Sequence, residues 1–343
     1  MISSRSAYCI RPATPPIFEI HDDTLSGPTG SQVLIKMHYT SVNPIDVKRA
    51  SGYGNRLLSL KKAAHFPLVL GNDVVGEVLE SGPRASDFQR GDWVVGVNPT
   101  GPRGTHSTHA LIPETLLRRV PDGSSTTDLA CLPYTFMTLW NAFQALKLHE
   151  DLVRGKKVLV YAGASALGQL CTQMLSRWGA KVVSMASRRH QDDCLSMGAA
   201  VFMDRHLLPI DSLPQDFDLT FNFGSWEADQ ALVRRLRPGA IGHASTVHPL
   251  MSAIDSNGWL KGGWEALQAF KRSKSIAQAC GARYTWTIFN PTSSGMDALI
   301  HAVTHHGISL NVGKLTPLTA VGDAFTHIAE QRRGRAVLAC QRV

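Results

Sequence analysis

The segment Val158–Gly168 most constrains the fold of this 343-residue chain. An apolar run, Val158–Tyr161, enters a turn of small residues, and an amphipathic stretch follows from Ala166. A strand, a tight turn and a helix in this order are typical of the unit that binds the pyrophosphate of a dinucleotide. The turn must be small because backbone N–H groups and the helix N-terminus contact the phosphates directly. The segment therefore predicts a nucleotide-binding α/β fold.

The turn departs at one position from the fingerprint Gly-x-Gly-x-x-Gly, because Ser165 stands at the central glycine. An ordinary strand-to-helix connection and the nucleophile elbow of α/β-hydrolases are the alternatives. The elbow requires a glycine two positions after the serine, where this chain has Leu167. As a dinucleotide site, the turn would bind the cofactor through Gly163, Ala164, Ser165, Ala166, Leu167 and Gly168.

The next apolar segment ends at Ala186 and is followed by Ser187, Arg188 and Arg189 rather than by an acidic residue. An acidic side chain at this place would hydrogen-bond a ribose 2′-hydroxyl, whereas arginines suit a 2′-phosphate. A solvated basic turn is the alternative. We therefore predict NADPH as the cofactor, with these three residues around its 2′-phosphate.

The spacing of apolar residues changes along the chain and predicts the fold class. Short segments broken by glycine and proline predict a β-rich region up to Thr127, helical spacing covers Asp128–Leu146, and strands alternate with helices from Lys156. This alternation predicts an α/β fold with a doubly wound parallel Rossmann sheet beside a β-rich domain. The strands expected in the Rossmann sheet are Val158–Tyr161, Val182–Ala186, Ala200–Met203, Leu219–Asn222 and Ala240–Ala244.

Elements outside that sheet are predicted in the same way. The glycine- and tryptophan-rich segment Ser256–Lys274 is expected to be an inserted loop and helix, serving as a lid, an interface or a surface excursion. The other expected elements are strands at Gln32–Met37, Val74–Leu79, Asp92–Val97 and Thr285–Phe289, a helix at Met296–His306 and a strand at Ala336–Ala339.

Composition limits the function classes. The formal charge is +8, from 35 basic and 27 acidic residues, but the chain has no nucleic-acid motif, so a polyanionic cofactor explains part of the charge. Six widely spaced cysteines suit reduced thiols inside a cell. We find no membrane span and no secretory signal, which predicts a cytoplasmic protein, or a mitochondrial matrix protein if a longer precursor exists.

Motifs along the whole chain resemble the zinc-free medium-chain dehydrogenase/reductases. The resemblance is to the quinone oxidoreductase group, and within it to the oxidoreductases like reticulon-4-interacting protein 1. The motifs are Ser41–Val47, Ser51–Gly54, Phe66–Gly76, Gly104–Ser107, Leu132–Tyr134, Thr138–Ala142, the turn described above and Gly334–Val337. The resemblance implies a GroES-like catalytic domain at 1–127, completed by 291–343, a Rossmann domain at 128–290, and a homodimer.

The resemblance also bears on metal binding. Zinc alcohol dehydrogenases of this superfamily have a cysteine where this chain has Asn43, and a His-Glu pair where it has Asn72 and Asp73. A catalytic zinc ion requires thiolate or imidazole ligands, which these positions do not supply. We therefore expect no metal.

The same resemblance suggests site residues. Tyr53 matches a tyrosine near the substrate, and a phenol can donate a hydrogen bond to an oxyanion and a proton to an enolate. Asn43 would face the substrate or the nicotinamide ribose. Thr138 would contact the nicotinamide end, Asn222 lies at the end of a Rossmann strand near the ribose, and Arg335 would help to hold the phosphorylated cofactor. A packed loop aromatic is the alternative for Tyr53.

These observations predict an NADPH-dependent oxidoreductase that delivers hydride to a quinone or an activated C=C bond of an enone or alkenal, without zinc. The alternative is a cofactor-binding protein of the same fold that acts mainly through a protein partner.

Overall fold

The computed structural model describes residues 1–341, and its chain forms two compact units. The first, here called the β-rich unit, comprises Met1–Met137, Asn290–Thr304 and Ser309–Val343. The second, the parallel-sheet unit, comprises Thr138–Phe289 and His305–Ile308. The chain leaves the first unit inside helix α4 (Pro133–Ala145) and returns to it at Asn290. The last residues of helix α10 (Ser293–His306) belong to the second unit, together with the residues up to Ile308.

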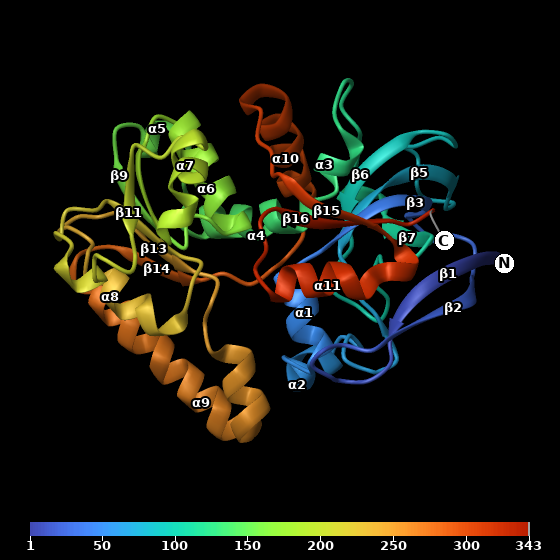
Figure 1. Cartoon of the computed structure of the whole chain (residues 1–343), viewed down its shortest axis with the longest axis horizontal. Helices are drawn as coiled ribbons and strands as arrows, with labels where there is room; N and C mark the ends of the chain where they lie inside the picture. The colour runs from blue at the N-terminus through green and yellow to red at the C-terminus, as the bar shows by residue number, and fades with distance from the viewer. Residues whose placement is uncertain (342–343) are drawn as a thin grey trace. The chain divides into compact units, whose positions relative to one another are not determined.

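Two sheets form the β-rich unit (Figure 1). The smaller sheet has the strand order β2-β1-β4, and the larger has the order β15-β16-β3-β5-β6-β8, with β7 paired to β3. The strands of the whole unit are β1 (Ile2–Cys9), β2 (Phe18–Leu25), β3 (Gln32–Val42), β4 (Leu68–Val69), β5 (Asp73–Ser81), β6 (Trp93–Val97), β7 (His109–Pro113), β8 (Leu117–Arg119), β15 (Val312–Pro317) and β16 (Arg335–Ala339). Its helices are α1 (Pro44–Ala50), α2 (Asn55–Ser59), α3 (Thr126–Leu129) and α11 (Val321–Ala329).

Residues from both ends of the chain build the core of this unit. Strand β16 pairs with β3, so that Ala336 lies opposite Val42. Helix α11 buries Phe325 against this layer, and the Phe18 ring lies 4.6 Å from the Phe325 ring. The C-terminal strand β16 is therefore an integral part of the larger sheet, where it lies beside β3.

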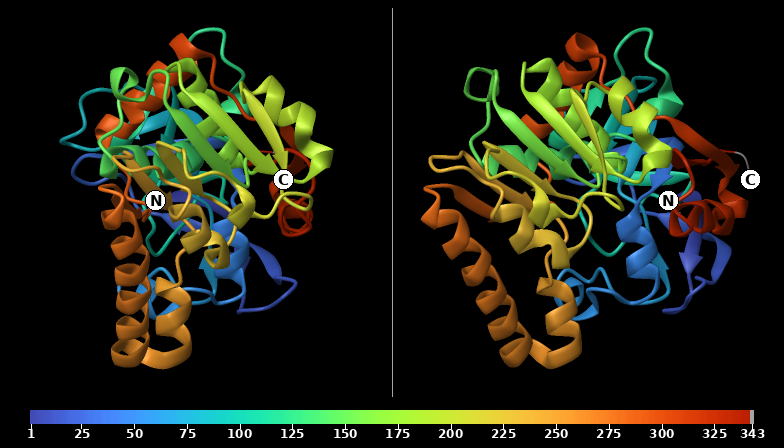
Figure 2. Two further views of the ribbon diagram at one scale, coloured as in Figure 1. Left: turned by 90° about the vertical axis from the view of Figure 1, so that its left-hand side faces the viewer. Right: turned by 60° about the vertical axis from the view of Figure 1, so that its left-hand side comes forward.

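The parallel-sheet unit has one six-stranded sheet with the order β11-β10-β9-β12-β13-β14, parallel throughout (Figure 2). The strands are β9 (Lys157–Tyr161), β10 (Lys181–Ala186), β11 (Val201–Asp204), β12 (Leu219–Asn222), β13 (Gly242–Ser245) and β14 (Arg283–Trp286). The helices are α5 (Glu150–Val153), α6 (Ala166–Arg177), α7 (Gln191–Ser196), α8 (Asp229–Val233) and α9 (Leu250–Ala279). Numbered within the unit, the order is 3-2-1-4-5-6, so the predicted α/β Rossmann class is confirmed.

The expected strand Thr285–Phe289 was placed too late, because β14 begins at Arg283 and ends at Trp286. The predicted helical region Asp128–Leu146 is divided between α3, which ends at Leu129, and α4, which begins at Pro133. Proline suits the first helical position, since its missing N–H has no partner there in any helix. The predicted excursion Ser256–Lys274 lies wholly within the helical run of α9.

Candidate functional site

The turn between β9 and α6 has the geometry of a phosphate-binding turn. Ser165 is the N-cap of α6, and its Oγ accepts a hydrogen bond from the Gly168 amide at 3.1 Å. A Cβ on Gly168 would lie 2.5 Å from the Ala162 carbonyl oxygen, and a Cβ on Gly163 would lie 1.9 Å from Ser184 Oγ. Glycine is thus required at Gly168, where the close atoms are backbone, whereas a side chain at Gly163 would have to displace the Ser184 hydroxyl. The first amides of α6 have no partner within the helix and can bind an anion.

The switch point of the sheet lies between β9 and β12, where the crossovers turn to opposite faces. Asn222, at the end of β12, is paired in register with Tyr161 at the end of β9. Its side chain is fully buried and serves the loop that follows: Nδ2 donates to the Ser225 carbonyl at 2.8 Å, and Oδ1 accepts from the Gly224 amide at 3.2 Å. Asn222 therefore shapes the Phe223–Ser225 loop beside the switch point.

The residues predicted to bind the 2′-phosphate directly follow β10. Arg188 and Arg189 are exposed in a short 3₁₀ turn, and Ser187 is half-buried. The Ser187 hydroxyl lies 3.2 Å from His206 Nε2, and the Arg189 side chain lies 3.1 Å from His190. Strand β10 is the neighbour of β9, so these residues and the Gly163–Gly168 turn lie at the carboxyl ends of adjacent strands.

Asn43, in the β-rich unit, lies in a buried hydrogen-bond network that also contains Arg335 and Asp73. Asn43 Nδ2 donates to Asp73 Oδ2 at 2.7 Å, and Asn43 Oδ1 accepts from Arg335 Nη2 at 2.5 Å. All three side chains are at most 5% exposed. Both ends of the Asn43 carboxamide are therefore held by the protein, and the arginine brings a positive charge beside it.

Asp73 is the centre of this network, which we call the Asp73 network: Asp73, Asn43, Ser41, Arg335 and the Tyr134 amide. The carboxylate accepts hydrogen bonds from Ser41 Oγ at 2.6 Å and from the Tyr134 amide at 2.7 Å, in addition to Asn43. Complete burial raises the Asp73 pKa from 3.8 to about 6, although these donors and Arg335 act in the opposite direction. Arg335 Nε has no hydrogen-bond partner among the described residues.

The backbone around Asn43 is fixed by a second carboxylate. Asp46 Oδ2 accepts from the Asn43 amide at 2.8 Å, and Asp46 Oδ1 accepts from the Gly71 amide at 3.1 Å. Asp46 is buried and lies in the first turn of α1. It thereby ties the start of α1 to the segment that leads into Asp73.

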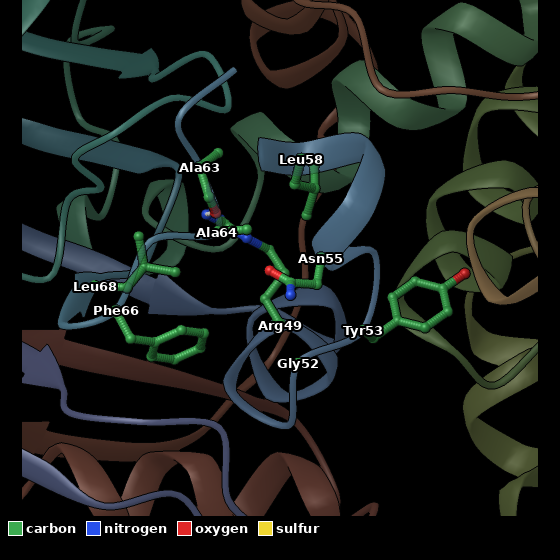
Figure 3. A pocket seen from close by; sticks show the side chains of 9 residues that line it. All are labelled: Arg49, Gly52, Tyr53, Asn55, Leu58, Ala63, Ala64, Phe66 and Leu68. Atoms are coloured by element: carbon green, nitrogen blue, oxygen red, sulfur yellow. Dashed lines mark hydrogen bonds between the residues drawn. The ribbon is translucent and has the colours of Figure 1, made fainter. Parts of the chain in front are cut away.

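Tyr53 lies in the turn between α1 and α2, beside a small pocket of the β-rich unit. The pocket is lined by Arg49, Gly52, Tyr53, Asn55, Leu58, Ala63, Ala64, Phe66 and Leu68. Figure 3 shows the Tyr53 ring pointing away from the other side chains that line it. Arg49 is only 5% exposed, and its Nη2 donates to the Ala63 carbonyl at 2.9 Å. The Lys48 ammonium lies 5.3 Å from the centre of the Tyr53 ring.

The predicted residues thus fall into separate groups. Arg335 and Asn43 contact each other in the β-rich unit. The Gly163–Gly168 turn and the arginine pair follow the carboxyl ends of the adjacent strands β9 and β10. Tyr53 lies apart from both groups in sequence, in the turn between α1 and α2. Thr138 is buried in α4 and begins the parallel-sheet unit. From the sequence, Asp46 and Asp73 are expected only to hold turns. The place of Asp73 next to Asn72, where the zinc enzymes carry a ligand pair, was a signal for a larger role.

The described part of the chain, residues 1–341, has neither a candidate metal cluster nor a candidate membrane span. No group of three or more His, Cys, Asp and Glu side chains in this range is arranged to hold a metal ion. No helix in the same range has the length and apolar character needed to cross a bilayer.

Comparison with known proteins gives four likenesses. A family model described as the alcohol dehydrogenase GroES-like domain matches residues 29–122. The chain is 28% identical over 328 residues to the mitochondrial NAD(P)H oxidoreductase RTN4IP1 of Mus musculus, covering 90% of this chain and 81% of that protein. Its fold is similar to the quinone oxidoreductase from Coxiella burnetii, with a TM-score of 0.81, 19% identity and coverage of 98% and 99% of the two chains. It is also similar to the CurK enoyl reductase, with a TM-score of 0.76, 19% identity and the same coverage.

Proposed function

We propose that this chain is a member of the medium-chain dehydrogenase/reductase family and, within it, an NADPH-dependent oxidoreductase acting on a quinone or an activated C=C bond without zinc. The observation that carries the proposal is the arrangement at the carboxyl ends of β9 and β10. A glycine-bounded turn capped by Ser165 lies at the first, and the exposed Arg188 and Arg189 lie at the second.

NADPH, when bound, supplies the hydride. The amides at the start of α6 would hold its pyrophosphate, because the helix N-terminus carries unpartnered N–H groups and a partial positive charge. Arg188 and Arg189 would bind the 2′-phosphate through charge-assisted hydrogen bonds, for which their exposed guanidinium groups are available. Asn222 would contribute by shaping the loop after β12, since its own carboxamide is engaged there. Thr138 remains our candidate for a contact near the nicotinamide.

The Asp73 network supports a mechanism without zinc. Asn43 and Asp73 stand where the zinc enzymes of the family carry ligands, but both are already bonded within the protein. A carboxamide is also a poor zinc ligand compared with thiolate or imidazole. Arg335 supplies a fixed positive charge at this place instead, and we propose that Asn43 acts by holding that guanidinium in position.

Tyr53 is the residue we propose to contact the substrate. Hydride addition to a quinone or to the β-carbon of an enone places negative charge on the carbonyl oxygen, and a preorganised O–H donor stabilises that charge. A phenol can also donate the proton that an enolate needs. In both substrate classes the negative charge develops on a carbonyl oxygen. The Coxiella burnetii protein is named as a quinone oxidoreductase, and CurK is named as an enoyl reductase.

A turnover assay tests this proposal. NADPH oxidation is followed with 1,4-naphthoquinone, 9,10-phenanthrenequinone and 2-alkenals. We expect turnover with at least one class, and we expect Tyr53→Phe to lower kcat about 100-fold because the donor is lost. Tyr39→Phe is the matched control and should leave kcat unchanged. Tight NADPH binding with no turnover would favour the alternative, a cofactor-binding protein that acts through a partner.

Two further predictions belong to this proposal. Strand β14 is an edge of the parallel sheet, which supports a homodimer paired along that edge, and light scattering on the purified chain tests it.

The sequence favours the cytoplasm, whereas the names of the RTN4IP1 relatives support the mitochondrial alternative. Microscopy of the chain tagged at its C-terminus distinguishes the two.

A further inference from the structure

Helix α9 is a helical hairpin rather than one straight rod. Gly258 has φ 76° and interrupts the helical run, so that residues 250–257 and 259–279 form two arms. The arms pack closely, because a Cβ on Gly262 would lie 2.1 Å from the Ala253 carbonyl oxygen, and Ile254 and Ala266 are buried. Figures 1 and 2 show that the tip extends well beyond the sheet of its own unit.

The outer face of the longer arm is apolar near the tip. Leu260, Trp264 and Leu267 are 91%, 61% and 43% exposed, and Trp259 beside them is 46% exposed. The first three follow the i, i+4, i+7 spacing that places side chains on one face of a helix. The buried contacts of Gly262 and Ala266 already hold the hairpin together. The exposed stripe is thus left for a partner outside the unit.

Basic residues accompany this stripe. Lys261 lies at the tip, and Lys271, Arg272 and Lys274 continue along the same arm, all of them exposed. Glu265 is the acidic residue of the arm, and it accepts a hydrogen bond from Asn257 at 2.6 Å. Residues 259–279 therefore carry four positive charges and one negative charge, a net charge of +3. An anionic surface would complement the arm.

We propose that the α9 tip docks this protein on the surface of a membrane that contains anionic phospholipids. Tryptophan and leucine side chains insert at the boundary between headgroups and acyl chains, and lysine and arginine bind the lipid phosphates. A second copy of the hairpin would bring two clusters of like charge together, so the charges favour the lipid. The inference is independent of the proposed reaction.

Co-sedimentation with vesicles tests the proposal on the full chain. The probes are phosphatidylcholine vesicles with and without about 30 mol% phosphatidylserine, at low and high salt. We expect binding to the anionic vesicles that weakens at high salt, and a blue shift of tryptophan fluorescence on binding. Leu260→Ser with Trp264→Ser and Leu267→Ser should weaken binding about tenfold or more. Lys261→Gln with Lys271→Gln and Arg272→Gln should weaken it about fivefold or more.

The control is Leu207→Ser with Leu208→Ser, because these residues are 69% and 41% exposed on another loop of the same unit. This control should bind vesicles like the unchanged chain, and thermal unfolding checks that every variant folds. Absence of binding to anionic vesicles overturns the proposal, as does binding that neither the apolar nor the basic substitutions weaken. A self-association that the apolar substitutions abolish, without vesicle binding, would assign the stripe to a second copy instead.

Discussion

Arg335 in the β-rich unit and the pair Arg188 and Arg189 in the parallel-sheet unit differ in burial and in their partners. In the β-rich unit, Arg335 is 5% exposed and bonded to Asn43 and Ser41 within the Asp73 network. In the parallel-sheet unit, Arg188 and Arg189 stand exposed after β10, and neither forms an ion pair with a carboxylate among the described residues. A buried guanidinium has its partners fixed by the fold, whereas an exposed one is available to a ligand.

This difference separates stability from binding. Removing a buried charge leaves its polar partners without hydrogen bonds where water cannot replace them, which lowers the free energy of unfolding. Removing an exposed arginine costs the fold little, because water already solvates it. The comparison therefore predicts that substitution of the buried Arg335 acts on the free energy of unfolding, and that substitutions of Arg188 and Arg189 act on cofactor affinity.

The largest effect is expected for Arg335→Met. Asn43 and Ser41 would lose a donor, and the Asp73 carboxylate would lose the nearby positive charge, so the free energy of unfolding should fall by about 4 kcal/mol. Urea denaturation measures it. Arg332→Met is the control, because its side chain is 58% exposed and paired on the surface with Glu330. That control should lose less than about 0.5 kcal/mol, and equal losses in the two variants would contradict the comparison.

The next effect is a pH dependence caused by Asp73. Its pKa is raised from 3.8 to about 6 in the folded protein, so between these values the folded state holds more protons than the unfolded state. Stability from this group therefore falls as pH rises from 4 to 6, by about 3 kcal/mol in total, and is constant above that range. The measurement is the difference in unfolding free energy between the unchanged chain and Asp73→Asn across this range. A difference that does not change with pH, or that grows in the other direction, would refute it.

The Asp73 network shows which features of the structure the sequence predicts and which it does not. Local patterns predicted the strands of the parallel sheet well: β12 has the expected bounds Leu219–Asn222, and β10 begins one residue before the expected Val182. Strands buried on both faces are continuous apolar runs, which a sequence reveals directly. The contact between Arg335 and Asn43 spans 292 positions, and no local pattern encodes it.

The burial of individual polar side chains could not be predicted from the sequence either. Asn43 and Arg335 were each chosen for a ligand contact, but their bonds to one another depend on β16 pairing with β3. Asn222 was expected near a ribose, whereas its carboxamide holds the following loop. By contrast, Arg188 and Arg189 directly follow a predicted strand, and exposure there needs no long-range contact.

A smaller effect is expected after β10. Arg188→Ala combined with Arg189→Ala should raise the NADPH dissociation constant at least tenfold, or about 1.4 kcal/mol, and leave NADH binding nearly unchanged. The unfolding free energy should change by less than about 0.5 kcal/mol. Calorimetry with both cofactors measures the affinities. Arg234→Ala, an exposed arginine at the end of α8, is the matched control. Equal losses for NADPH and NADH would refute the 2′-phosphate assignment.

The smallest effect concerns Ser165, which stands at the fingerprint's central glycine. Ser165→Ala removes the Oγ that accepts from the Gly168 amide, and should cost about 1 kcal/mol of unfolding free energy. Ser165→Gly restores the glycine pattern and should cost only a few tenths of a kcal/mol, because glycine is tolerated at an N-cap. NADPH affinity should change less than about twofold for the glycine variant, since the phosphate contacts we propose are main-chain groups. A large loss of affinity in Ser165→Gly with unchanged stability would instead assign the hydroxyl itself to the cofactor. The exposed ligand groups of the parallel-sheet unit would then include a side chain of the turn as well as the arginines.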